Sequence, residues 1–387
     1  MSAVSHMDNG VQIAFQKFYE DYLKAYRPSP EQNSAAYSIM LCKSGQLGVN
    51  AFLCEECGHI EFHNNSCRNR NCPSCQAVLR EIWIDNRSSE IIDASYFHVV
   101  FTVPFELNDL IYANQSVLYS LMHRVVSQTL LQLSADKKFL GATPGIIQVL
   151  HTWGQELNYH PHIHCIVTGA GLTSDMRFVK GRDCFFIPVR VLSKVFRGKF
   201  IHELQKLSVS EALSFPGKLS HLNSSEGWAV FVKKLYSKEW VPYVKETFKQ
   251  FGNAVKYLGR YAHRVAISNS RIISVSDDGV SFSVKDYRDG SSKIITIPGV
   301  EFIRRFLLHV LPKGFQKIRY AGFLNNRCKS RNLNVICRCT GKALSMRRLS
   351  GLDMAGLIFA IWGVNICTCP VCNCDSLKPL GIRYMRN

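Results

Sequence analysis

Apolar side chains recur at the spacing of an α-helix along several stretches of the chain. This periodicity places one face of a helix against a core. It is seen over residues 11–41, 78–94, 106–133, 252–262 and 301–311. The last stretch ends at Pro312-Lys313-Gly314, where proline and glycine stop a helix. We therefore expect helices over these ranges. Residues 185–240 are mixed, and we expect a helix in their later part.

Three other stretches are rich in β-branched and aromatic residues and predict buried strands. They are residues 96–103, 146–153 and 162–168. A loop that holds Gly154 and Asn158 joins the last two, so we expect an antiparallel hairpin there. Residues 264–298 alternate in polarity between turn signals, which predicts a small β-meander. The tail from residue 325 is basic and cysteine-rich, and we expect it to be partly disordered away from its cysteines.

The composition is that of a globular protein with an anionic partner. Of the 387 residues, 47% are hydrophobic and 20% are charged, and no apolar run is long enough to span a bilayer. The N-terminus lacks a basic start followed by an apolar stretch, so we expect no signal peptide, no membrane contact and a cytoplasmic location. The net charge of +18 attracts polyanions and favours nucleic acid as the partner. The alternatives are a charge that serves solubility, or a protein that associates with the ribosome.

Two cysteine pairs near the N-terminus have the spacing of a metal site. Each is a C-x2-C pair, and fourteen residues separate them. Four thiolates so arranged hold one tetrahedral Zn²⁺, which stabilises a segment too small to form its own core. Cytosolic thiols stay reduced, so clustered cysteines favour a metal over disulfides. The predicted ligands are Cys54, Cys57, Cys72 and Cys75.

The loop between these pairs holds three further candidates. Cys67 belongs to no C-x2-C pair, but it can replace one of the four ligands or join a histidine at a second metal. Arg68 and Arg70 place guanidinium groups beside the metal, which suits contact with DNA phosphates. The alternative for this loop is an ordinary solvated segment.

Another C-x2-C pair, Cys369 and Cys372, lies near the C-terminus. Cys337 and Cys339 can complete a zinc site with it, although they form no second pair of the same spacing. Cysteines that bind no metal are the alternative here.

A run of alternating histidines follows the first strand of the predicted hairpin. Residues 160–164 read His-Pro-His-Ile-His, so their imidazoles share one face of a strand. His162 and His164, on either side of a buried hydrophobic residue, can hold a divalent metal that polarises a phosphodiester. A third ligand is needed, and we favour His151 on the paired strand over Gln155 in the loop.

Two tyrosines lie four residues apart on the helix predicted over 252–262. Tyr257 and Tyr261 therefore share a helix face. A tyrosine hydroxyl can attack a phosphodiester and keep the bond energy in a covalent adduct, although such pairs more often pack in a core. Neighbouring cations that can hold phosphates are Lys256, Arg260 and Arg264.

Together these motifs resemble the rolling-circle insertion-sequence transposases, the two-tyrosine branch of the HUH endonucleases. The resemblance runs over nearly the whole chain, in order. It covers Asn-Ser-Cys-Arg-Asn-Arg-Asn-Cys-Pro-Ser-Cys-Gln (65–76), Phe-His-Val-Val-Phe-Thr (97–102), His-Thr-Trp-Gly (151–154), the histidine run, Tyr-Leu-Gly-Arg-Tyr (257–261), and segments 301–315 and 319–324. One departure is Asn71, which stands where the family commonly has a histidine before Cys-Pro.

The resemblance implies an α+β chain with three parts. Residues 1–94 are a helical and zinc-binding DNA-recognition domain, and 95–324 an HUH-type catalytic domain with a central antiparallel sheet flanked by helices. Residues 325–387 are a basic, cysteine-rich segment. It further implies structural Zn²⁺, catalytic Mg²⁺ or Mn²⁺, single-stranded DNA at element ends as the substrate, and action at the nucleoid.

By the same resemblance, His162 and His164 match the HUH ligands, and Tyr257 and Tyr261 match the paired nucleophiles. One strand is nicked, leaving a 5′-phosphotyrosine and a free 3′-hydroxyl, and we favour Tyr257 as the primary nucleophile. The alternatives are a zinc-dependent DNA-binding regulator, and a replication initiator or relaxase with the same chemistry. The sequence has no glycine-rich loop of the Walker type, so we expect no nucleotide cofactor.

Overall fold

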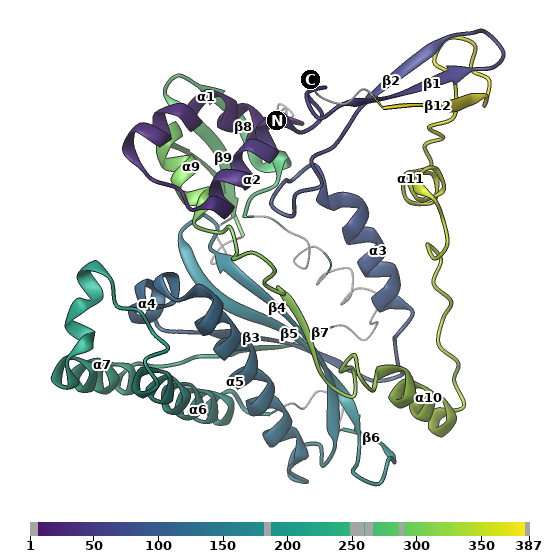
Figure 1. Cartoon of the computed structure of the whole chain (residues 1–387). Helices are drawn as coiled ribbons and strands as arrows, with labels where there is room; N and C mark the ends of the chain where they lie inside the picture. The colour runs from purple at the N-terminus through teal and green to yellow at the C-terminus, as the bar shows by residue number, and fades with distance from the viewer. Residues whose placement is uncertain (1–6, 182–186, 248–258, 260–265, 286–289, 384–387) are drawn as a thin grey trace.

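The computed structural model describes residues 7–181, 187–247, 259, 266–285 and 290–383. Figure 1 shows a central sheet with helices, a smaller body of helices and strands, and an extended arm, whose sheet has three strands. No helix among the described residues is both long and apolar enough to cross a membrane.

The central sheet is antiparallel and six-stranded. Its strands are β3 (Tyr96–Thr102), β4 (Thr143–Trp153), β5 (Tyr159–Leu172), β6 (Phe178–Lys180), β7 (Tyr243–Thr247) and β11 (Ile318–Gly322). The order is β11-β4-β5-β3-β7, and β6 pairs with the end of β5. The predicted hairpin is confirmed as β4 and β5, with His151 opposite His162 in the register.

Helices bury one face of this sheet. They are α4 (Asn108–Ala113), α5 (Gln115–Ala135), α6 (Val189–Val209) and α7 (Ser225–Ser237), with the 3-10 helices η1 (Phe105–Leu107) and η2 (Gly217–Asn223). Alternate residues of β5, among them Ile163, Cys165 and Val167, join the core beneath α5 and α6. Because side chains alternate along a strand, His162 and His164 lie on the opposite face.

The prediction of a single helix over 106–133 is wrong, because the helix is interrupted at Asn114, between α4 and α5. The Asn114 amide donates to the carbonyls of Leu110 and Ser214, and its oxygen accepts from the Ser214 amide. The backbone of Asn114 leaves the helical conformation, with φ −128° and ψ 41°, although its N–H still donates to Leu110 and its carbonyl still accepts from Leu118.

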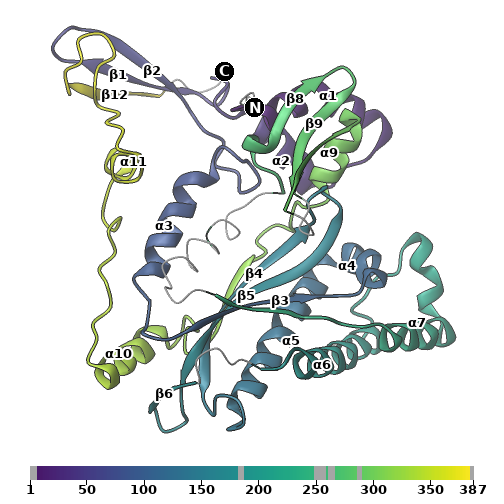
Figure 2. The ribbon, with the colours of Figure 1, turned by 180° about the vertical axis from the view of Figure 1, so that it is seen from behind.

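The opposite face of the sheet carries α3 (Gln76–Ser88) and α10 (Lys329–Thr340), as Figure 2 shows from behind. The core there joins Ile147 and Ile166 of the sheet to Ile336 of α10. The Trp83 indole of α3 donates to the Tyr320 hydroxyl of β11 over 3.0 Å. The C-terminal part of α3 is therefore fixed to the face that carries the histidines.

The smaller body combines the N-terminal helices of the predicted zinc-binding domain with the last elements of the predicted catalytic domain. It contains α1 (Gly10–Ala25), α2 (Pro30–Leu41), η3 (Asn269–Arg271), β8 (Ile272–Ser276), β9 (Gly279–Lys285), β10 (Ser292–Ile297) and α9 (Gly299–Leu307). The predicted β-meander is confirmed as β8–β10. The helix predicted over 11–41 is two helices, because Ser29 and Pro30 start a new one with a capping box to Gln32.

The third region is the arm. Strands β1 (Val49–Cys54) and β2 (Ile60–Asn64) form a hairpin, and β12 (Leu377–Arg383) pairs with β1 from the far end of the chain. Helix α11 (Met354–Trp362) precedes β12. The expected partial disorder of the tail is corrected for residues 325–383, which contain α10, α11 and β12.

The cores do not follow the boundaries predicted at residues 94 and 324. Phe15 of α1 packs in one cluster with Phe282 and Phe306, and β1 shares a small cluster with Leu377. A strand or helix completes a core wherever its apolar face fits, and sequence distance does not limit this. The three predicted domains stay predictions.

Candidate functional site: a histidine triad and two cysteine clusters

Three imidazoles converge on the face of the sheet opposite α5 and α6. His151 comes from β4, and His162 and His164 come from β5. Their ligand nitrogens all lie within 4.8 Å of one another. The Nε2 atoms of His162 and His164 are 3.1 Å apart. Two nitrogens bound at ~2.1 Å to one metal, at a right angle, lie about 3 Å apart, so the spacing fits a divalent cation.

Burial favours the neutral form of the two imidazoles on β5. His151 is 2% exposed and His164 is 9% exposed. Burial lowers the pKa of His162 to about 4, and it places the pKa of His164 well below the usual histidine range. A neutral imidazole has a lone pair to give to a metal, whereas a protonated one repels it.

Hydrogen bonds at Nδ1 orient the two imidazoles of β5 so that their Nε2 atoms face each other. The Nδ1 atom of His162 donates to the backbone carbonyl of His160 over 2.7 Å. The Nδ1 atom of His164 lies 2.8 Å from Nε2 of His98, which stands on β3. Outer partners of this kind fix the tautomer of metal-binding histidines. The sequence analysis did not assign His98, although it is the one histidine in the strand predicted over 96–103.

The structure distinguishes the two candidates for the third ligand. The His151 ring lies 4.4 Å from the His164 ring, centroid to centroid, and stacks on Trp153. Gln155 lies in the β4–β5 loop, where its backbone carbonyl accepts from the Arg271 guanidinium over 2.6 Å. The convergence of imidazoles therefore favours His151.

The tyrosine pair lies outside the described residues. So do Lys256, Arg260 and Arg264, which were predicted to hold phosphates beside it. Gly259, between the two tyrosines, is described: it is helical and buried. A Cβ atom built there would lie 2.3 Å from the Cγ1 atom of Ile84, so this residue packs directly on α3.

The four predicted zinc ligands do not form one site, and that prediction is corrected. Cys72 and Cys75 lie with Cys42, at the end of α2, and with Cys67. The Sγ atoms of Cys42 and Cys75 are 3.5 Å apart, and those of Cys67 and Cys75 are 3.6 Å apart. Cys67, predicted as an alternative ligand, joins the group, and Cys42 was missed because it stands alone in the sequence.

Cys54 and Cys57 belong to a different cluster. They lie with Cys369 and Cys372, in the loop before β12. The physical reason is the strand pairing: β12 lies beside β1, so the C-terminal pair meets the pair at the end of β1. The signal in the sequence was the third C-x2-C pair, which we had matched with Cys337 and Cys339.

The two predicted phosphate contacts in the cysteine-rich loop differ in their surroundings. Arg70 donates from Nη1 to the carbonyl of Phe315 over 2.9 Å, which ties the loop to the segment before β11. Arg68 is exposed, with a left-handed backbone at φ 54°. Contact with DNA remains a prediction for both.

Comparisons with known proteins give matches for the segment that carries the histidines and for the N-terminal cysteine-rich segment. Residues 145–331 match the Y2 family described as "Putative transposase", and residues 14–103 match the IS91-type "Transposase zinc-binding domain". The "Putative transposase y4qJ" of Sinorhizobium fredii (strain NBRC 101917 / NGR234) is 41% identical over 330 residues, which cover 84% of this chain and 83% of that protein. The "Transposase for insertion sequence element IS801" of Pseudomonas savastanoi pv. phaseolicola is 29% identical, over 75% of this chain and 69% of that protein.

Among solved structures, the metal-bound form of the conjugative relaxase TrwC in complex with oriT DNA covers 44% of this chain and 71% of its own. Its identity is 15% and its TM-score is 0.24, which is too low to support an argument about the site.

Proposed function

This chain belongs to the Y2 transposases with an IS91-type zinc-binding domain, and we propose that it nicks and rejoins single-stranded DNA through a tyrosine–phosphate intermediate. The observation that carries this proposal is the convergence of His151, His162 and His164 on one face of the sheet. A bound Mg²⁺ or Mn²⁺ would polarise the scissile phosphate as a Lewis acid. Imidazole suits several divalent metals, so the choice between these two belongs to the proposal.

The chain's own residues supply the rest of the proposed reaction. The phenol of Tyr257 loses its proton as its oxygen attacks phosphorus, the bond to the 3′-oxygen breaks, and that oxygen takes up a proton. The products are a 5′-phosphotyrosine and a free 3′-hydroxyl. Tyr261 serves the second strand during transfer, and a 3′-hydroxyl that attacks the adduct restores the phosphodiester and frees the tyrosine.

The packing of Gly259 supports this assignment. Gly259 lies against Ile84 of α3, and α3 is fixed to the histidine-bearing face through Trp83 and Tyr320. Gly259, the residue between the two tyrosines in the sequence, therefore packs on the same side of the sheet as the imidazoles. A nucleophile that acts at a metal-bound phosphate must come from that side.

The charge and the zinc unit support DNA as the substrate. A net charge of +18 attracts the phosphate backbone, and counterion release makes such binding salt-dependent. We assign Zn²⁺ to the cluster of Cys42, Cys67, Cys72 and Cys75, where it would fix the loop that carries Arg68 and Arg70. We further propose single-stranded element ends as the target and the nucleoid, in the cytoplasm, as the place of action.

The proposal is tested by trapping the covalent intermediate. The full chain is incubated with Mn²⁺ and a labelled single-stranded oligonucleotide that carries an element end, and the products are separated on a denaturing gel. Wild type should give a protein–DNA band that protease removes, and Tyr257→Phe combined with Tyr261→Phe should abolish it while binding persists. Comparison of the single variants tests whether Tyr257 is the primary nucleophile.

Two results would count against the proposal. An adduct that survives in the double variant would overturn the assignment of the tyrosines. Binding without any adduct in wild type, with Mg²⁺ and with Mn²⁺, would favour the DNA-binding regulator instead. A replication initiator or relaxase would form the same adduct, and the family membership favours transposition over both.

A further inference from the structure

We propose that Cys54, Cys57, Cys369 and Cys372 form a second structural zinc site, whose metal fastens the C-terminal segment to the arm. Two of these ligands lie outside residues 14–103, the range that matches the zinc-binding domain. The site is also separate from the cluster around Cys72, since the two share no residue.

The sulfur positions fit a tetrahedral ion. The Sγ atoms of Cys54 and Cys372 are 3.5 Å apart, and those of Cys57 and Cys369 are 3.6 Å apart. Four thiolates at ~2.3 Å around Zn²⁺ place their sulfurs about 3.8 Å from one another. A disulfide needs ~2.05 Å between sulfurs, so these contacts are not disulfides. Four cysteines without histidine or carboxylate select a soft tetrahedral metal such as zinc.

The two C-x2-C loops have the same local geometry. After the first pair, the Gly58 amide donates to the Cys54 carbonyl over 3.0 Å, with φ 70° at Gly58. After the second, the Asn373 amide donates to the Cys369 carbonyl over 2.9 Å, with φ 60° at Asn373. Glycine and asparagine are the residues that accept this left-handed conformation at least cost. Two matched turns that face each other with four thiols point to one shared ligand.

The surrounding packing is too small to hold the arm without a metal. The local core consists of Cys54, Cys369 and Leu377, with Phe52 and Cys372 packed against it. Strand β12 pairs with β1 so that Leu377 stands opposite Cys54. A three-stranded sheet with so few apolar side chains needs an additional stabilising element, and a structural metal can supply it. The Ser376 hydroxyl, 3.0 Å from the Cys54 sulfur, adds an outer hydrogen bond.

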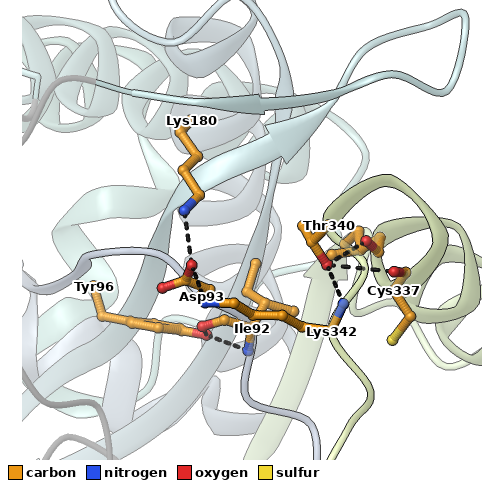
Figure 3. A network of polar contacts seen from close by, with 8 residues as sticks. Ile92, Asp93, Tyr96, Lys180, Cys337, Thr340 and Lys342 are labelled. Atoms are coloured by element: carbon orange, nitrogen blue, oxygen red, sulfur yellow. Dashed lines mark hydrogen bonds and ion pairs between the residues drawn. The ribbon is translucent and has the colours of Figure 1, made fainter.

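Two sets of hydrogen bonds are among the contacts that attach the C-terminal segment to the body before the arm. Figure 3 shows the first, where Asp93 accepts from Lys342 over 2.7 Å and from Lys180 over 3.0 Å, just after α10. At the second, the Asp85 carboxylate of α3 accepts from the backbone amides of Arg348 and Leu349. The segment then continues through α11 to the arm, as Figure 1 shows. The second zinc would be its last attachment, and it would close a loop between cysteines 312 positions apart.

The test counts zinc per chain in the full-length protein by elemental analysis after dialysis. Cys369→Ser combined with Cys372→Ser should lose one zinc relative to wild type. The matched control is Cys367→Ser combined with Cys374→Ser, which changes the flanking cysteines and should lose none. The same zinc content in Cys369→Ser/Cys372→Ser and in wild type would overturn the proposal. An equal loss in the control, or iron in place of zinc, would overturn it too.

A second measurement covers the case in which the variant unfolds. Wild type reconstituted with Co²⁺ should show thiolate-to-cobalt absorption for eight thiolates, about twice that of one four-cysteine site. Absorption for four thiolates alone would contradict the proposal. Chymotrypsin should also cleave after Leu377, which is buried while β12 is anchored, faster in Cys369→Ser/Cys372→Ser than in the control. Neither result depends on DNA cleavage, so His162→Ala, without an adduct, should keep both zinc ions.

Discussion

The Nε2 atom of His98 lies 2.8 Å from the Nδ1 atom of His164, and the two rings are nearly parallel. For the Nε2 atom of His164 to bind a metal, its Nδ1 atom must carry the proton and donate it to His98. His98 therefore sets the tautomer and the plane of a proposed ligand from the neighbouring strand. It is a positioning residue, since the metal would be bound by His164.

His98→Ala should lower the affinity for the metal more than it lowers the rate at saturating metal. Loss of such an outer partner costs about 10–100-fold in metal affinity. The measurement is the Mn²⁺ concentration that gives half-maximal oligonucleotide cleavage, together with the maximal rate. The control is His202→Ala, at an exposed position on α6. An unchanged half-maximal concentration with a lower maximal rate would contradict the positioning role.

His162→Ala and His160→Ala should behave differently although the residues are two apart on β5. His162 presents Nε2 to the proposed metal, whereas His160 contributes only its backbone carbonyl to the hydrogen bond with Nδ1 of His162. Alanine at 160 keeps that carbonyl. We expect His162→Ala to reduce cleavage by about 100-fold or more, and His160→Ala to stay within a few-fold of wild type. Equal losses in the two variants, measured as adduct formed at fixed Mn²⁺, would argue against the ligand assignment.

The sequence predicted the strands and the histidine triad because their signals are local. A strand pattern followed by a turn gives the β4–β5 hairpin, and the hairpin brings His151 to His162. The cysteines were paired wrongly because spacing tells which two residues share a loop, but not which loops meet. Cys54 meets Cys372 only because β12 pairs with β1 across most of the chain. The helix predicted over 11–41 is divided at Ser29 by a capping box. The helix predicted over 106–133 is divided at Asn114, whose side chain bonds to the distant Ser214.

Acid should destabilise the protein through His309. This buried imidazole donates from Nε2 to the Leu157 carbonyl over 3.0 Å and accepts at Nδ1 from the Thr152 hydroxyl over 3.2 Å. Burial lowers the pKa of His309 from 6.5 to about 4 in the folded protein. As the pH falls, His309 is therefore protonated in the unfolded chain at a higher pH than in the folded protein. The contribution of neutral His309 to the free energy of unfolding is thus fully present above pH 6.5 and is lost as the pH falls towards 4. This contribution is about 3 kcal/mol, because a difference of one in pKa corresponds to ~1.36 kcal/mol.

His309→Gln removes this titration and keeps an amide that can donate and accept. We expect a loss of about 1–2 kcal/mol at pH 8, from imperfect hydrogen bonds, and a shallower fall in the free energy of unfolding between pH 6.5 and 4. Urea unfolding at several pH values measures both. The control is His202→Gln at the exposed site, which should follow wild type. A variant whose stability falls as steeply as that of wild type would show that His309 does not titrate in this range.

Gly299→Ala should destabilise the body that joins α1 to α9. Gly299 is the first residue of α9 and is buried, and a Cβ atom there would lie 2.2 Å from the Cγ atom of Phe18. The Phe18 ring is 8% exposed and packs in the same core, so it has little room to move. Overpacking of this kind costs about 1–3 kcal/mol.

Gly198→Ala is the matched control, because Gly198 lies inside α6 with no atom within 4 Å of its added Cβ, apart from its own helix backbone and its chain neighbours. Alanine in a helix interior is favoured over glycine by about 0.5–1 kcal/mol, so Gly198→Ala should raise the melting temperature while Gly299→Ala lowers it. If Gly299→Ala left the melting temperature unchanged or raised it, the close approach of α9 to α1 at Phe18 would not exist in solution.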